Sequence, residues 1–135
     1  MAIHIVRLGS PRGKAEGVRI GTVRRPPRGV PRHEFASRNF YDVWLPNLAP
    51  SEALLKRALQ ADDERAWRSF ARSFRSEMKR PEASRVLDLL AAMSRGADFS
   101  IGCYCVDEAR CHRSILRALL EECGAKIDGS AGPKA

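Results

Sequence analysis

A short segment near the end of the chain holds most of the side chains that could do chemistry. It runs from Cys103 to Ser114 and reads Cys-Tyr-Cys-Val-Asp-Glu-Ala-Arg-Cys-His-Arg-Ser. The pattern predicts a strand, a loop and the first turn of a helix. Ligands of open α/β sheets bind where strands end and helices begin, and the free N–H groups of a first helical turn favour an anion. This segment is therefore the candidate site.

Each candidate residue has a role that its chemistry suggests. A helix N-terminus lowers the pKa of a thiol, so Cys111 is a candidate thiolate, and Cys105 is a second candidate nucleophile. His112 can serve as a base or a donor, and Arg113 can hold an oxyanion or phosphate by two parallel hydrogen bonds. Ser114 joins Arg113 in the predicted anion-binding set.

Simpler structural roles compete with these assignments. Cys103 alternates with the apolar residues of the predicted strand and is expected in the core. Cys123 lies beside the apolar face of the last predicted helix and is expected to pack there. Arg113 has potential ion-pair partners in Asp107 and Glu108.

A metal site is a further interpretation. Cys103, Cys105, Cys111 and His112 supply four possible ligands, but the spacing C-x-C-x5-C-H is not a standard zinc pattern. Adjacent residues of a helix project about 100° apart, so shared coordination by Cys111 and His112 is disfavoured. The expectation is a site without metal, and the sequence identifies no cofactor.

Charge along the chain is uneven. The 135 residues carry a formal charge of +8. Residues 1–38 hold nine basic and two acidic side chains, which gives +7, and residues 39–135 hold fifteen and fourteen, which gives +1. A local basic excess suits an anionic small molecule or nucleic acid, although a solubilising surface would show the same pattern. Arg24 and Arg28 belong to a proline-rich, extended basic loop that is predicted to rim the anion site.

Several functional classes find no support. No apolar run approaches the ~20 residues that span a bilayer, so no membrane association is expected. The N-terminus lacks the features of a secretion signal, which predicts a cytoplasmic protein with free cysteines. The sequence contains no Gly-x-Ser-x-Gly elbow and no Gly-rich phosphate loop. Oligomeric state is left open.

Hydrophobic periodicity predicts the elements that position the site. Strands are expected at residues 3–8, 18–23, 41–45, 98–105 and 125–128, and helices after Ser51, around Trp67–Met78, at about 82–95 and at about 112–123. Phe74 of the second helix and Leu116 of the last helix are expected in the core. The third helix is expected to bury Val86, Leu87, Leu90 and Met93. A basic stripe on the second helix is expected to be solvated and comprises Arg65, Arg68, Arg72, Arg75 and Lys79.

Strands near both ends with helices between them predict an α/β fold. Its sheet is expected to be small and at least partly parallel, with helices flanking it, in a single compact domain over residues 1–128. Residues 129–135 are expected to form a flexible tail. If the strands before the two candidate loops are parallel neighbours, both loops emerge at one edge of the sheet.

The residues also resemble a known family. Cys103, followed eight positions later by Cys111-His112-Arg113, resembles the C-terminal signature of the bacterial domain-of-unknown-function family 488. Three further stretches resemble its shorter, YeaO-like branch: Arg24 with Pro27-Arg28-Gly29, Trp44 to Ser51, and Phe74 with Glu77-Met78. The resemblance covers residues 3–127 and implies a compact α/β domain without a settled activity.

Two positions depart from the family pattern. Val23 stands where the branch usually has an Asp, and Cys105 stands where many relatives have a Glu. If those acids do chemistry in relatives, this protein lacks that chemistry or uses the Cys105 thiol instead. The favoured hypothesis is therefore binding of a nucleotide, nucleic acid or phosphorylated metabolite, and the alternative is a cysteine-dependent enzyme or redox protein.

Overall fold

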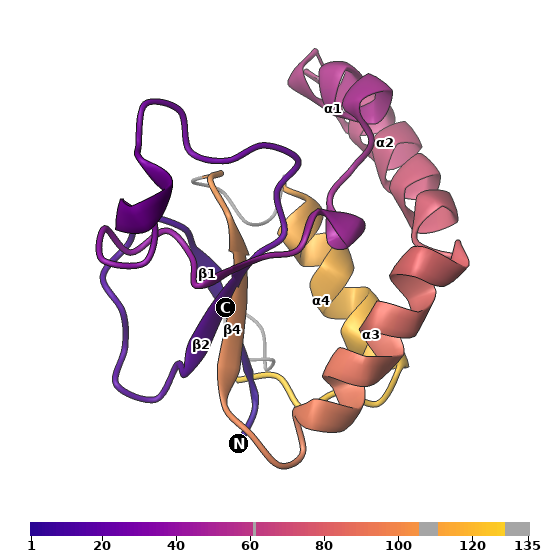
Figure 1. Cartoon of the computed structure of the whole chain (residues 1–135). Coiled ribbons are helices and arrows are strands. Elements are labelled where there is room, and N and C mark those ends of the chain that lie inside the picture. Colours follow the sequence, from indigo (N-terminus) through magenta and orange to yellow (C-terminus); the bar gives the residue numbers. More distant parts are fainter. Residues whose placement is uncertain (61, 106–110, 129–135) are drawn as a thin grey trace.

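The computed structural model describes residues 1–60, 62–105 and 111–128. Within these residues, four strands and four α-helices follow one another along the chain, and Figure 1 shows how they are arranged in space. Their bounds are β1 Ile3–Arg7, β2 Val18–Gly21, β3 Val43–Trp44, α1 Glu52–Leu59, α2 Glu64–Glu77, α3 Pro81–Met93, β4 Phe99–Cys103 and α4 His112–Glu122. Two 3-10 helices, Arg32–Glu34 and Pro46–Leu48, lie within the long connections. The predicted tail at 129–135 and the polar loop at 107–110 lie outside the described residues.

The strands form one parallel sheet in the order β1-β4-β2-β3. An isolated parallel bridge between Ile3 and Ile127 extends its β1 edge, where the sequence predicted a short strand. The expected α/β class is confirmed, and the described residues form one compact domain. Because β2 and β4 are parallel neighbours, the loops that follow them leave the same edge of the sheet.

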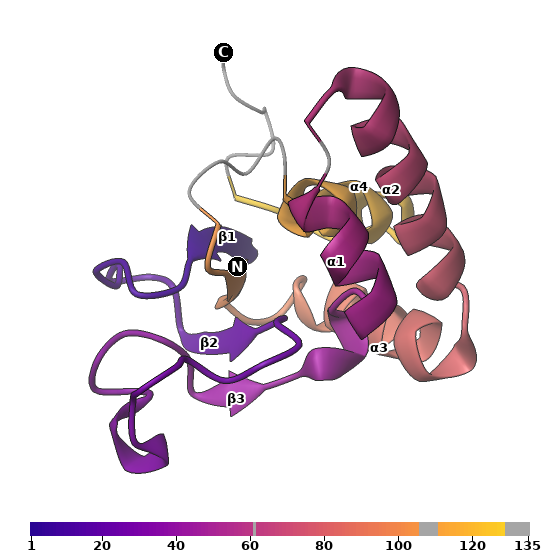
Figure 2. The ribbon, with the colours of Figure 1, turned by 90° about the horizontal axis from the view of Figure 1, so that it is seen from above.

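All four helices cover one face of the sheet (Figure 2). Their apolar stripes meet Ile3, Ile20 and Ile101 from the strands in one core. Phe74 of α2 and Leu116 of α4 are fully buried in it, as their spacing predicts. Long helices thus fix the position of the α4 N-terminus relative to the sheet.

Irregular segments cover the opposite face, where a polar cluster replaces a second helical layer. Arg19 is 0% exposed and its guanidinium binds the Glu16 carboxylate at 2.7 Å. The same guanidinium donates to the carbonyls of Ser10 and Asn39. Two long loops are therefore joined to the sheet through one buried cation.

Some predicted details are wrong. Met93 is 42% exposed, because α3 turns Leu90 and Ala91 toward the core in its last turn and Met93 away from it. Cys123 is exposed because it follows the last helical turn of α4, beyond the packed face. The strand predicted to reach Val23 ends at Gly21.

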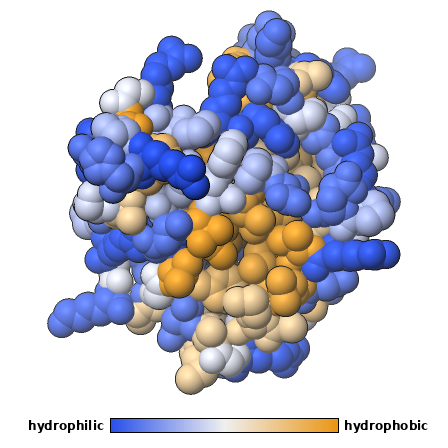
Figure 3. Space-filling view, viewed as in Figure 1, coloured by the Kyte–Doolittle hydropathy of each residue, from blue (hydrophilic) through white to orange (hydrophobic). Residues whose placement is uncertain are grey.

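The surface of the molecule carries both charged and apolar side chains. No helix in the described part of the chain has the length and apolar character needed to cross a membrane. Figure 3 shows a hydrophobic patch in the middle of the face seen in Figure 1, surrounded by hydrophilic residues. The predicted basic stripe of α2 is mostly exposed, and its Arg75 forms an ion pair with Glu122 of α4.

Candidate functional site

Two buried thiols meet where β4 ends and α4 begins. Cys103 is the last residue of β4, and Cys111 is the N-cap of α4. Their sulfur atoms lie 2.6 Å apart, and the two residues are 1% and 2% exposed. This separation is longer than the 2.05 Å of a disulfide and well inside the ordinary contact distance of two sulfur atoms. Cys103 is in the core, as predicted, but it is also part of the site.

His112 is held in one orientation by the end of β2. Its Nε2 lies 2.6 Å from the Thr22 carbonyl oxygen, which can only accept, so Nε2 must carry a proton. Burial lowers the pKa of His112 and favours the neutral ring, although the Thr22 carbonyl opposes this shift. Nδ1 therefore has a free lone pair, and it lies 3.7 Å from the Cys111 sulfur.

Cys105 is the exposed member of the thiol group. Hydrogen bonds from Cys103 and then Cys111 lower the pKa of Cys105, and the positive charge of Arg113 adds to the effect. The same contacts, with burial, raise the pKa of Cys103. For Cys111, the contact with Cys103 lowers the pKa, but the contact with Cys105 and burial outweigh it. These shifts favour the thiolate form at Cys105 and the protonated thiol at Cys103 and Cys111.

Arg113 lies beside Cys105. It is 3% exposed, and its Nη2 donates to the carbonyl oxygen of Cys105 at 2.6 Å. Its Nε is buried and has no hydrogen-bond partner among the described residues. The predicted alternative partners, Asp107 and Glu108, lie outside the described residues.

Most of the chain matches the model of a known protein family. A family model described as DUF488-N3a, the active DUF488-N3 subclade, matches residues 3–124. The chain belongs to the DUF488 family. The resemblance drawn from the Cys-His-Arg element is confirmed at the level of the family. No curated protein and no solved structure matches the chain.

The site of this DUF488 domain departs from one geometric expectation. Helical spacing predicts that Cys111 and His112 project about 100° apart, which disfavours shared coordination of a metal ion. Cys111 instead has extended backbone angles, φ −132° and ψ 152°, because it caps the helix and does not lie within it. The 100° rule for helical neighbours therefore does not apply, and the sulfur and Nδ1 face each other.

The basic loop meets the site through its backbone. Tyr104 donates its hydroxyl to the carbonyl oxygen of Arg25 at 2.9 Å, which joins the loops after β4 and β2 as expected. The Arg24 guanidinium, however, donates to the carbonyls of Pro46, Ala49 and Pro50. It fixes the entry to α1, so an anion would have to compete with three carbonyl oxygens.

The other two predicted anion-binding residues have different environments. Arg28 is exposed on the loop. Ser114 donates its hydroxyl to the Cys111 carbonyl at 2.9 Å, which stabilises the first turn of α4. The structure thus brings together the three thiols, His112 and Arg113, while Arg24 and Ser114 bind backbone carbonyls.

Sequence reasoning missed the residues that support this group. Thr22 fixes the tautomer of His112. The two residues are brought together by the parallel pairing of β2 with β4, which local sequence patterns do not show. Tyr41 and Tyr104 pack with Cys103 and Cys111 in a second apolar cluster. No spacing in the chain connects these residues, because they come from three separate loops.

The arrangement allows three kinds of chemistry. The exposed thiolate of Cys105 can attack an electrophile. The close thiols can exchange with a disulfide. Cys103, Cys111 and His112 also place two sulfur atoms and one ring nitrogen within 4.8 Å of one another, which is a possible ligand set for a metal ion.

Proposed function

We propose that this DUF488 domain is a cysteine-dependent enzyme in which the thiolate of Cys105 attacks the substrate. The observation that carries the proposal is the close pair of buried thiols, Cys103 and Cys111, with the exposed Cys105 hydrogen-bonded to both. Neighbouring hydrogen-bond donors stabilise the thiolate, which is the nucleophilic form of a cysteine, and exposure to solvent gives a substrate access to it. Description of the matching subclade as active is in keeping with an enzyme.

Neighbouring groups supply the remaining roles. Arg113 stabilises the negative charge on Cys105. Its Nε, which has no hydrogen-bond partner within residues 1–60, 62–105 and 111–128, offers one more donor at the site. Neutral His112 presents Nδ1 to the Cys111 thiol, so it can accept the Cys111 proton. Burial of His112 and the Thr22 carbonyl keep this acceptor in one tautomer.

The extra thiols favour a disulfide as the substrate. The Cys105 sulfur would bond to one substrate sulfur as the substrate S–S bond breaks, and the other half leaves with the electron pair as a thiolate. Cys111 then gives its proton to His112 Nδ1 and attacks the Cys105 sulfur. The Cys105–Cys111 disulfide forms, the second substrate half leaves as a thiolate, and the two protein thiols have lost two electrons to the substrate disulfide.

Alkylation with iodoacetamide, mapped by peptide mass, tests the nucleophile. Cys105 should be modified at least tenfold faster than Cys123 at pH 7, since Cys123 is also exposed but its pKa is raised by burial and by Asp88. The fast phase should vanish in Cys105→Ser and persist in Cys123→Ser. Equal rates at the two exposed cysteines would overturn the proposal.

Glutathione disulfide tests the reaction class. The wild-type protein should end as an internal disulfide, two hydrogen masses lighter, whereas Cys111→Ser should accumulate a glutathione adduct on Cys105. If neither the internal disulfide nor the glutathione adduct forms, the disulfide step is refuted. If Cys105 is still alkylated fast in that case, it is a nucleophile for a different electrophile.

A metal centre is the second candidate function. Metal-binding histidines usually donate their other ring N–H to a carbonyl or carboxylate, as His112 does to Thr22. Two thiolates on a tetrahedral zinc lie about 3.8 Å apart, so Cys103 and Cys111 would have to separate. Protein mass under native and denaturing conditions distinguishes the candidates: a bound zinc lost with chelator, together with slow alkylation until it is removed, would favour the metal centre.

A further inference from the structure

A second site on the molecule combines aromatic walls with basic side chains. A cavity of about 450 Å³ lies between the basic loop and β3, on the loop-covered side of the sheet. Phe35, Tyr41 and Trp44 line it together with Arg32 and His33. Pockets that hold small ligands are mostly apolar with a few placed polar groups, and this volume is in their usual range.

Trp44 is held as a fixed, open aromatic surface. The residue is 44% exposed, and its Nε1 donates to the Val23 carbonyl at 2.7 Å. That hydrogen bond restrains the indole ring even though much of it faces solvent. An exposed aromatic ring that is already oriented loses little conformational freedom when a planar ligand stacks on it.

Tyr41 forms the inner wall and holds an unused polar group. The residue is 3% exposed, and its hydroxyl has no hydrogen-bond partner in the described part of the chain. Its ring contacts Phe35 edge-on, with centroids 5.2 Å apart. A buried hydroxyl without a partner is costly, and a ligand group that hydrogen-bonds to it would remove that cost.

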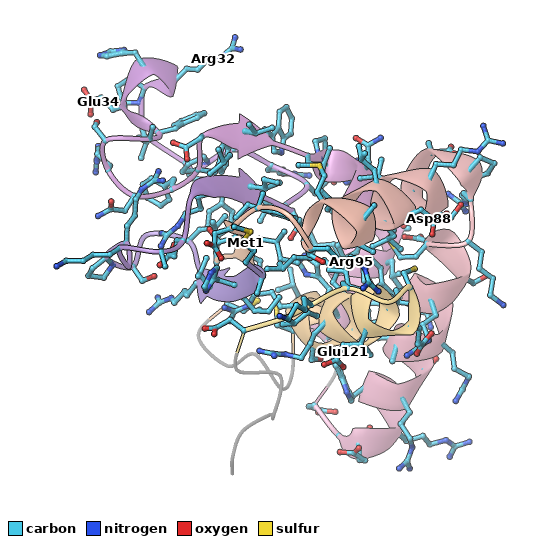
Figure 4. The ribbon with its side chains drawn as sticks, turned by 90° about the horizontal axis from the view of Figure 1, so that it is seen from below. Met1, Arg32, Glu34, Asp88, Arg95 and Glu121 are labelled. Atoms are coloured by element: carbon cyan, nitrogen blue, oxygen red, sulfur yellow. The ribbon has the colours of Figure 1, made fainter. Side chains whose placement is uncertain are left out.

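The charges at the mouth select an anion. Arg32 is exposed, and its guanidinium makes no hydrogen bond or ion pair with any other described residue. Figure 4 shows its side chain directed away from Glu34. Asp42 also lines the cavity, but Arg12 binds both of its carboxylate oxygens, at 2.8 and 3.0 Å. The Asp42 charge is therefore compensated, and the Arg32 guanidinium is the positive charge at the mouth of the cavity.

We infer that this cavity binds a free mononucleotide, with the base against Trp44 and the phosphate on Arg32. A planar ring that carries a phosphate matches the aromatic wall and the free guanidinium together. Tyr41 packs in the same cluster as Cys103 and Cys111, so the nucleotide would lie at the same end of the sheet as the thiols. The inference does not rest on Cys105 chemistry.

AMP is the probe for this site. The chain has two tryptophans, so Trp67→Phe leaves Trp44 as the only indole and makes its fluorescence a direct report. AMP should quench this signal saturably, and adenosine should bind about tenfold more weakly because it lacks the phosphate. Arg32→Ala should weaken AMP binding about tenfold, and Arg28→Ala, an exposed arginine of the same loop outside the cavity lining, should leave it unchanged.

Several outcomes would overturn the inference. These are the absence of saturable AMP binding, equal affinity for AMP and adenosine, or equal losses in Arg32→Ala and Arg28→Ala. Binding of a single-stranded oligonucleotide without AMP would show that the site reads nucleic acid instead. Cys105→Ser should bind AMP normally, so failure of the nucleotide site and failure of the thiol chemistry are separable.

Discussion

At the scale of single residues, the ionisation of Cys105 is the property that decides its reactivity. A lowered pKa means that its thiolate is present at neutral pH and is lost only when the pH falls toward that pKa. Its alkylation rate should therefore stay nearly constant between pH 6 and 8. Cys123, whose pKa is raised, should gain about tenfold in rate per pH unit over the same range. Rates that climb in parallel at both cysteines would contradict the stabilised thiolate.

Gly21 shows how closely the loop side packs on the sheet. A Cβ atom at this position would lie 2.3 Å from a ring carbon of Tyr41. Gly21→Ala should therefore lower the free energy of unfolding by about 1–3 kcal/mol or more, as overpacking does. Gly96→Ala is the matched control, because a Cβ there meets nothing within 4 Å. Urea denaturation of both variants measures the difference, and similar midpoints would disprove the contact.

At the scale of elements, one cap joins two helices. Ser51 is the N-cap of α1, and its side chain accepts a hydrogen bond from the Leu54 N–H. The Glu77 carboxylate, at the end of α2, accepts from both the Ser51 backbone N–H and the Ser51 hydroxyl. The start of α1 is thus fixed to the end of α2.

Ser51→Ala should therefore cost more than an ordinary cap. Loss of a cap costs about 1 kcal/mol, and loss of the bond to the Glu77 carboxylate brings the expected total to about 2 kcal/mol. Asp63→Ala removes the cap of α2, which serves that helix alone, and should cost about 1 kcal/mol. Equal destabilisation of the two variants in urea would show that the link to Glu77 adds nothing.

At the scale of the whole molecule, the buried Glu16–Arg19 pair joins the loop layer to the sheet. Glu16→Gln leaves the buried Arg19 charge without its counter-ion and should lower the free energy of unfolding by about 3–5 kcal/mol. Glu34→Gln breaks the solvent-facing pair with Arg38 and should cost about 0–1 kcal/mol.

The cost of Glu16→Gln should also depend on pH. Although burial opposes it, hydrogen bonds from the Gly13 N–H and Arg19 lower the pKa of Glu16 in the folded protein. Its stabilisation is therefore complete above its unfolded pKa of 4.5 and is lost as the pH falls below that value. The stability difference between wild type and Glu16→Gln should shrink between pH 5 and 3, and a constant difference would contradict the ion pair.

The sequence by itself determined the local elements and the chemical inventory. Apolar spacing predicts Phe74 and Leu116 in the core. Capping chemistry predicts Ser51 at a helix start, and the pattern of strand, loop and helix predicts Cys111 to Arg113 at a helix N-terminus. These features depend on residues only a few positions apart in the sequence. Hydrophobic periodicity and capping chemistry are therefore sufficient to predict them. The same local reasoning failed at Met93, whose exposure depends on how α3 packs.

Only the tertiary structure decided which of those residues act together. The pairing of β2 with β4 carries Thr22 to His112, which are 90 positions apart, and so fixes the histidine tautomer. The guanidinium of Arg24 binds the carbonyls that precede α1 and so stabilises the fold. The guanidinium of Arg32 lines the aromatic cavity and has no partner in the described part of the chain. Such contacts join distant segments, and no local pattern encodes them, because their geometry exists only once the sheet and its two covering layers have assembled.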